Sequence, residues 1–186
     1  MKNVLFIHSA GPQGNGQGSS QLLDYLQKSL RLESHFYAPV MPSPENPSYE
    51  QWRSVLNEQL AGLQEDITLI GHSLGGSVLL KYLSEEACSL SISGLFVMGS
   101  PCWGLDEEWP FKEFQLSDDF SSRLSCIQQI YLYHSRNDEV VPFSHLEHYS
   151  HKLPNAKTRI FDQCGHLFQN ELPELIQDIN ALWQGA

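Results

Sequence analysis

Short apolar runs, separated by longer amphipathic stretches, constrain the fold of this chain more than any other feature. The runs occupy residues 4–8, 35–40, 67–71, 94–99, 130–134 and 158–161. They are nearly continuous in apolar residues, which is typical of parallel strands that are covered on both faces. Because strands alternate with helices along the chain, we predict an α/β protein: a three-layer α/β/α sandwich with a mainly parallel sheet of about six strands.

Helix signals lie between these runs. Ser48 with Gln51 reads as a capping box, Ser144 with Glu147 as a second capping pair, and Pro173 suits the first position of a last helix. The chain has 186 residues, and no linker rich in Pro, Gly or Ser divides it. We therefore expect one domain spanning residues 1–186.

A G-x-S-x-G pattern at residues 71–75 follows the run 67–71 and precedes an amphipathic stretch. In that setting the serine occupies a strained strand-to-helix turn, and the glycines leave room for the adjoining strand and helix. The pattern alone is common by chance, and an ordinary turn that holds a serine would also match it. Its position between a strand and a helix makes Ser73 the predicted nucleophile.

A serine hydroxyl needs a base to take its proton and an acid to orient that base. Two loops after later runs carry such groups: Asp138 follows the run 130–134, and His166 follows the run 158–161. Because the carboxyl ends of parallel strands meet at one edge of the sheet, both groups are expected near Ser73.

Other titratable residues compete for these roles. Glu139 neighbours Asp138 and stays open as a rival acid, although Asp138 is favoured at the tip of the loop. Histidines recur at His145, His148 and His151, which raises the question of a metal site. We expect these three on the solvated face of a helix, and we predict neither a metal nor an organic cofactor.

Acyl transfer also needs two backbone N–H donors that hold the oxyanion. Leu74, directly after the predicted nucleophile, is one candidate, and Ala10 in the loop after the first run is the other. That loop holds several glycines between residues 11 and 18, but their spacing matches neither common phosphate-binding pattern. A phosphate cradle is therefore disfavoured.

An aromatic segment at residues 101–116 interrupts the alternation of strands and helices. Trp103, Trp109 and Phe111 lie in it. These rings suit the wall of a substrate pocket or a small lid, and they equally suit a plug packed onto the sheet. Both readings stay open.

Charge and cysteine content limit the partners and the compartment. The net charge is −11, from 22 acidic and 11 basic residues, which disfavours nucleic acid and anionic membrane surfaces as partners. The four cysteines are widely spaced, and we find neither a signal-peptide core nor a stretch long enough to span a membrane. A cytoplasmic protein with reduced thiols is expected.

The chain resembles the α/β-hydrolase superfamily and, within it, the small serine hydrolases typified by retinoblastoma-binding protein nine. The resemblance covers nearly the whole chain and rests on residues 41–47 before Trp52, the pattern at 71–75, and the segments 138–142 and 165–168. It implies a compact sheet, a minimal cap and hydrolysis of carboxylic esters. One departure is that many relatives end the first strand with His-Gly, whereas this chain has His8-Ser9, next to the candidate donor Ala10.

Two functions follow as hypotheses. The first is a serine hydrolase that cleaves small carboxylic esters through an acyl-enzyme intermediate, with Ser73, His166 and Asp138 as a triad. The second is a binding or regulatory protein that uses a hydrolase scaffold without turnover. The presence of all three side chains in the sequence favours the first.

Overall fold

The computed structural model describes residues 1–63, 66–86, 91–125, 127–169 and 171–185. In this part of the chain, six strands form one sheet in the order β2-β1-β3-β4-β5-β6, and every neighbouring pair is parallel. The strands are β1 (Lys2–Ile7), β2 (Ser34–Tyr37), β3 (Ile67–His72), β4 (Ile92–Met98), β5 (Ile127–Ser135) and β6 (Lys157–Phe161). The helices are α1 (Ser20–Leu30), α2 (Tyr49–Ala61), α3 (Leu74–Glu85), α4 (Ser144–Lys152) and α5 (Pro173–Gln184), with short 3₁₀ helices η1 (Lys112–Phe114) and η2 (Phe120–Leu124).

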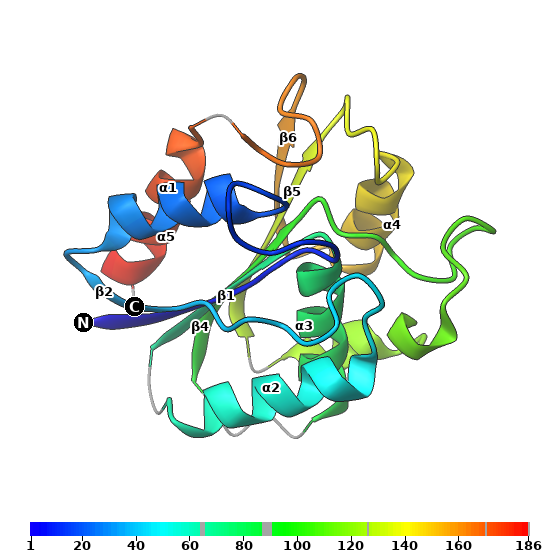
Figure 1. Ribbon diagram of the computed structural model, residues 1–186, viewed down its shortest axis with the longest axis horizontal. Coiled ribbons are helices and arrows are strands. Elements are labelled where there is room, and N and C mark those ends of the chain that lie inside the picture. The colour runs from blue at the N-terminus through cyan, green and yellow to red at the C-terminus, as the bar shows by residue number, and fades with distance from the viewer. Residues whose placement is uncertain (64–65, 87–90, 126, 170, 186) are drawn as a thin grey trace.

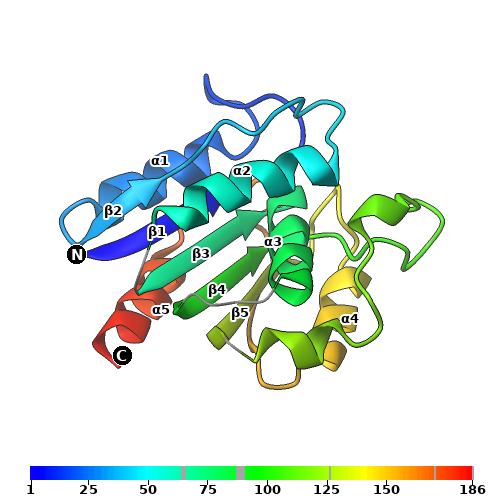
Figure 2. The ribbon, with the colours of Figure 1, turned by 90° about the horizontal axis from the view of Figure 1, so that it is seen from below.

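Helices cover the two faces of the sheet unequally (Figures 1 and 2). α1 and α5 pack on one face, where their leucines and isoleucines meet the side chains of alternate strand positions. α2, α3 and α4 pack on the other face, together with η1 and η2. The predicted three-layer α/β/α sandwich with a parallel sheet is therefore confirmed.

The sequence located all six strands, but their burial differs from the expectation. β3 and β4 are buried along their whole length, as strands covered on both faces should be. β6 is an edge strand and is exposed at Lys157, Thr158, Arg159 and Ile160. The expectation of full cover was wrong for this strand and for β2, the opposite edge strand, where His35 and Tyr37 are exposed, because each has a neighbouring strand on one side only.

Two of the predicted helix caps are also corrected. Ser48 does occupy the residue before α2, yet its side chain caps no backbone N–H. Ser144 lies inside α4, because the N–H of His145 already donates to the carbonyl of Pro142 at 3.0 Å and the turn begins earlier. Pro173 opens α5 as predicted.

An ion pair between an exposed arginine and a largely buried aspartate ties the edge strand to the last helix. Arg159 of β6 donates through Nε and one terminal nitrogen to the two carboxylate oxygens of Asp178 in α5, at 2.9 and 2.7 Å. The hydroxyl of Tyr133 in β5 donates to the same carboxylate at 2.5 Å. In addition, Trp183 near the end of α5 donates from its indole N–H to Thr68 of β3 at 3.0 Å. The C-terminal helix thus holds both the centre and the edge of the sheet.

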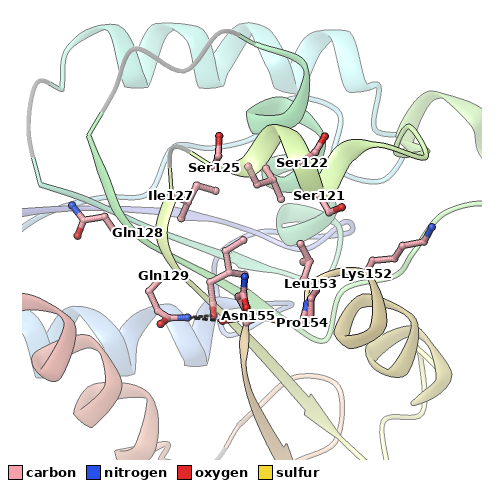
Figure 3. Close-up of a pocket in the computed structure, with 13 residues that line it drawn as sticks. Ser121, Ser122, Ser125, Ile127, Gln128, Gln129, Lys152, Leu153, Pro154 and Asn155 are labelled. Carbon is pink, nitrogen blue, oxygen red and sulfur yellow. Dashed lines mark hydrogen bonds between the residues drawn. The ribbon is translucent and has the colours of Figure 1, made fainter.

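A cavity of about 580 Å³ lies beside the amino ends of β5 and β6 (Figure 3). It is lined by residues that precede or begin these strands, including Ile127, Gln129, Lys152 and Asn155. The predicted functional residues follow the carboxyl ends of their strands, so this cavity belongs to the opposite edge of the sheet. Separately, within the described ranges no helix combines the length and apolar character that a bilayer crossing requires.

Candidate active site

Ser73 occupies a sharp turn between β3 and α3. Its backbone has φ 53° and ψ −121°, a region that a residue with a side chain rarely adopts and that surrounding structure must enforce. The side chain is largely buried, with 8% of its surface exposed. The predicted strand-to-helix turn is present at this position.

The glycines around Ser73 are required by space. A methyl group at Gly71 would lie 2.5 Å from the backbone of Gly76, and one at Gly75 would lie 2.3 Å from the carbonyl oxygen of Ile7. Such contacts are far inside van der Waals distance, so any side chain would separate α3 from β3 or from the end of β1. The turn can form only with glycine at these two positions.

Asp138 and His166 meet although 28 positions separate them. Asp138 lies after β5 and His166 after β6, and the ring Nδ1 of His166 is 2.9 Å from Oδ2 of Asp138. The carboxylate of Asp138 is fully buried. Its other oxygen accepts the backbone N–H groups of Val140 and Val141 at 2.9 and 2.8 Å.

These contacts keep Asp138 ionised. Burial opposes the charged form, but the hydrogen bonds from His166 and from the Val141 and Val140 amides outweigh it, and the pKa of Asp138 is lowered. A charged carboxylate fixes the tautomer of His166 with its proton on Nδ1. The second nitrogen, Nε2, is then left with a lone pair that can accept a proton.

Glu139, the rival acid, contacts a different part of His166. One oxygen of its carboxylate accepts the backbone N–H of His166 at 3.2 Å, whereas the ring contact belongs to Asp138. Asp162 lies at the surface, 3.6 Å from Arg136. The structure therefore separates two tasks that the sequence left open: Asp138 holds the ring, and Glu139 holds the backbone.

The loop that carries His166 is packed against the turn that carries Ser73. The ring of His72, directly before Ser73, lies 5.0 Å from the ring of His166, and its Nε2 is 2.8 Å from the His166 carbonyl oxygen. The hydroxyl of Ser73 makes no hydrogen bond with any other described residue. In active sites without substrate, the serine–histidine hydrogen bond is often long and shortens when substrate binds.

The two candidate oxyanion donors differ in how they are presented. Leu74 begins α3, so its N–H has no acceptor within the helix. In the other loop, the N–H of Ser9 donates to Ser19 and that of Gly11 donates to the carbonyl of Pro44. Between them, the N–H of Ala10 has no acceptor among the described residues. Ala10 is the amide of this trio that could still take a ligand oxygen.

The aromatic segment 101–116 is partly core and partly surface. Phe114 is buried in the core and Trp103 packs against it, whereas Phe111 is exposed. Trp109 stacks edge-on against Trp103 and against His145 of α4, with centroid distances of 5.0 and 5.6 Å. Of the two readings, the plug describes the Phe114 end, and the suggested role of Trp103, Trp109 and Phe111 in a pocket stays a prediction.

The histidines of α4 do not share one solvated face, which corrects the prediction. His145 is fully buried; its Nδ1 accepts the backbone N–H of Cys102 at 2.9 Å, and its Nε2 lies 3.3 Å from the carboxylate of Asp106. His148 is half-buried and His151 is exposed. No group of side chains within the described ranges has the make-up of a metal site.

Two of the four cysteines lie in the described part of the chain, and both are free. Cys102 is buried, and this burial is the main reason that the pKa of its thiol is raised to about 11. Cys164 is half-buried. Cys88 and Cys126 lie outside the described residues.

Comparisons with known proteins agree with this architecture. The family model for serine hydrolases matches residues 20–172. The YdeN protein of Bacillus subtilis is 25% identical over 173 residues, which cover 91% of this chain and 88% of that protein. Its crystal structure superposes with a TM-score of 0.84 at 21% identity, over 99% of this chain and 100% of the other.

More distant solved structures share the fold. A meta-cleavage product hydrolase from Pseudomonas fluorescens has a TM-score of 0.77 at 15% identity, over all of this chain and 91% of the other. A serine hydrolase from Cycloclasticus zankles has a TM-score of 0.75 at 18% identity, over all of this chain and 90% of the other. With the family model matching most of the chain, this protein belongs to the serine hydrolase family of the α/β-hydrolase superfamily, and it is a hydrolase.

Proposed function

We propose that this hydrolase cleaves small carboxylic esters through an acyl-enzyme intermediate. Ser73 is the nucleophile, His166 the base and Asp138 the group that orients the base. The observation that carries the proposal is the 2.9 Å contact between His166 Nδ1 and the buried, ionised carboxylate of Asp138, on a loop packed against the strained turn of Ser73. This arrangement leaves Nε2 of His166 as the proton acceptor for a nearby hydroxyl.

The reaction has two steps. In the first, His166 Nε2 takes the proton of Ser73 as Oγ attacks the ester carbonyl carbon, and the N–H groups of Leu74 and Ala10 hold the oxyanion. The tetrahedral intermediate collapses, the bond to the alcohol oxygen breaks, and His166 gives its proton to the leaving alcohol. In the second step, His166 takes a proton from water, hydroxide adds to the acyl carbon, and Ser73 leaves with that proton.

Asp138 stabilises the imidazolium that forms in both steps. Because protein side chains and amides supply every proton transfer and the oxyanion contacts, the proposed reaction needs neither a metal nor an organic cofactor. The acidic surface, with its net charge of −11, favours uncharged esters and disfavours nucleic acid or anionic membranes as partners. A cytoplasmic location completes the proposal.

The test combines active-site labelling with turnover. The protein is incubated with a fluorophosphonate probe, and hydrolysis of p-nitrophenyl acetate, butyrate and octanoate is measured in parallel. We expect labelling of the wild type and its loss in Ser73→Ala, with kcat/KM lowered by about 10³-fold or more. Ser84→Ala is the matched control, because Ser84 lies in α3, the helix that directly follows Ser73, and among the described residues its hydroxyl donates to the carbonyl of Lys81 away from the turn.

The control variant should keep both labelling and turnover. An unlabelled wild type that turns over none of the esters would contradict the proposal and favour the alternative, a binding protein on a hydrolase scaffold. Labelling that survives Ser73→Ala would assign the nucleophile to another residue.

A further inference from the structure

A chain of buried hydrogen bonds connects the three loops of the candidate site. The N–H of Ser9, next to Ala10, donates to the hydroxyl oxygen of Ser19 at 2.9 Å. Ser19 Oγ lies 2.8 Å from Nδ1 of His72, and Nε2 of His72 lies 2.8 Å from the carbonyl oxygen of His166. The side chains that form these hydrogen bonds are buried, and that of His72 is completely buried.

The chemistry of the partners fixes the state of His72. A carbonyl oxygen can only accept, so the proton of His72 must sit on Nε2 and point to His166. Nδ1 then carries a lone pair and accepts the hydroxyl proton of Ser19. Burial lowers the pKa of His72 to about 3, so the ring stays neutral and keeps this single tautomer near neutral pH.

His166 is supported from two sides, and His72 supplies one of them. On the side of β5, the amides of Cys164, Gly165 and His166 donate to Ser135, Asn137 and Glu139. On the side of β3, the carbonyl of His166 accepts from His72, which directly precedes Ser73. Within the described ranges, this is the hydrogen bond that joins the His166 loop to the turn of the nucleophile.

The side chain of Ser9 makes a second contact with Ser19 in this hydrogen-bond network. Its hydroxyl lies 3.1 Å from Ser19 Oγ, a contact that the glycine expected at this position in relatives could not make. The departure of this sequence from His-Gly therefore adds a side chain to the network. The loop that presents Ala10 is fastened, through Ser19, to the same imidazole that holds His166.

We propose that His72 is a positioning residue that fixes the distance between His166 and Ser73 by clamping the main-chain carbonyl of His166, and that Ser19 orients the His72 ring for this task. This inference rests on the proposed function of Ser73 and His166. His72 does not touch substrate; it acts through the placement of the base.

Two substitutions of His72 separate its two hydrogen bonds. Glutamine places an amide N–H₂ near the former Nε2 and can still donate to His166, whereas asparagine is shorter and reaches only toward Ser19. We expect kcat for p-nitrophenyl acetate to fall by about 30- to 100-fold in His72→Asn and by no more than about 5-fold in His72→Gln, with KM within about 3-fold in both. Ser19→Ala should fall between them.

Thr68→Val is the matched control. Thr68 is fully buried on the same strand, and its hydroxyl accepts the indole N–H of Trp183, so the variant also loses one buried hydrogen bond. It should lower the free energy of unfolding without changing kcat by more than about 2-fold. If the fall in kcat of the His72 variants were caused only by lower stability, Thr68→Val would show a similar fall.

Amide hydrogen exchange supplies a readout that does not depend on turnover. In His72→Asn, the amides at 164–166 should exchange at least about 10-fold faster relative to the amides of α5, and in Thr68→Val this ratio should not change. Equal kcat losses in His72→Asn and His72→Gln, or an unchanged exchange ratio in His72→Asn, would overturn the positioning role. A wild type that is neither labelled nor active contradicts the proposed function instead, and the exchange ratio still decides whether His72 holds the His166 loop.

Discussion

The loops around Asp138 and His166 and the aromatic segment 101–116 lie on the same edge of the sheet, yet they are held by different forces. In the first region, carboxylates, amides and hydroxyls are paired at 2.6–3.2 Å, including both oxygens of the Asp138 carboxylate. In the second, rings contact rings, and the indole N–H groups of Trp103 and Trp109 are buried without a hydrogen-bond partner in the described residues.

The difference matters because hydrogen bonds are directional and aromatic packing tolerates displacement. A base that must meet a nucleophile needs its position fixed to a fraction of an ångström. A surface that contacts variable substrates can shift at little cost. We infer that the paired loops govern the rate of the chemistry, and that the aromatic segment governs which esters are accepted.

The largest effect is expected from a substitution at the centre of the hydrogen-bonded loops around Asp138 and His166. Asp138→Asn removes the charge that stabilises the imidazolium and favours the wrong tautomer of His166, so kcat should fall by about 10³- to 10⁴-fold. Glu139→Gln keeps an oxygen for the His166 amide and should cost less than about 10-fold. Steady-state kinetics with p-nitrophenyl butyrate compare the two; similar losses would mean that the acid was assigned wrongly.

A pair of glycine substitutions compares the stability of the Ser73 turn, against which the His166 loop packs, with that of the aromatic segment. In Gly71→Ala the new methyl group meets the backbone of Gly76 at 2.5 Å, so we expect a loss of about 4 kcal/mol or more, or no folded protein. In Gly104→Ala the methyl group meets the flexible side chain of Gln115, and the positive φ of 84° costs about 1–2 kcal/mol. Urea unfolding measures both. Equal losses would contradict the view that the aromatic segment yields more easily.

The pH dependence of stability reports on the buried His72. Burial, together with His166 and His8, lowers its pKa from 6.5 to about 3, although Asp138 acts in the opposite direction. Between about pH 6.5 and pH 3, His72 is therefore protonated in the unfolded chain and neutral in the folded chain. The free energy of unfolding falls as the pH drops from 6.5 toward 3.

From about pH 6.5 to 5, His72 should account for about 2 kcal/mol of this loss, at about 1.4 kcal/mol per pH unit. His72→Gln should flatten the profile by a comparable amount in urea unfolding at the two pH values. Parallel profiles for wild type and variant would show that His72 does not remain neutral.

The smallest expected effect belongs to the aromatic segment. Trp109→Phe removes a buried N–H that has no hydrogen-bond partner among the described residues while keeping a ring against Trp103 and His145, so stability should change by less than about 1 kcal/mol. The ratio of kcat/KM for p-nitrophenyl octanoate to that for the acetate should change by about 3-fold or more. A drop in kcat for the acetate of the size expected for Asp138→Asn would place Trp109 in the chemistry.

Local patterns predicted the architecture well, because β1, β3 and β4 contain dense apolar runs and the turn at Ser73 needs glycines in fixed places. They could not show which strands end at the edges of the sheet, so β6 was expected to be covered. They also misplaced His145, since the residue that covers it, Trp109, comes from a distant segment. Long-range packing leaves no local pattern.

The candidate site shows the same limit. Asp138 and His166 were selected because their loops follow strands that end at one edge, and the structure brings their side chains together. The backbone contact of Glu139 and the role of His72 were missed. A histidine inside a serine motif is read as part of the motif, and nothing nearby in the sequence indicates that Ser19 will lie beside it.

The Arg159–Asp178 ion pair has a consequence for biosynthesis. β6, which leads to His166, is fastened by a side chain of α5, and α5 follows β6 along the chain. A growing chain that has just exposed residue 166 therefore lacks the element that secures it. Until α5 has been made and has folded onto the sheet, the strand that leads to His166 is held without the Arg159–Asp178 pair, so the placement of His166 depends on a helix that comes after it in the sequence.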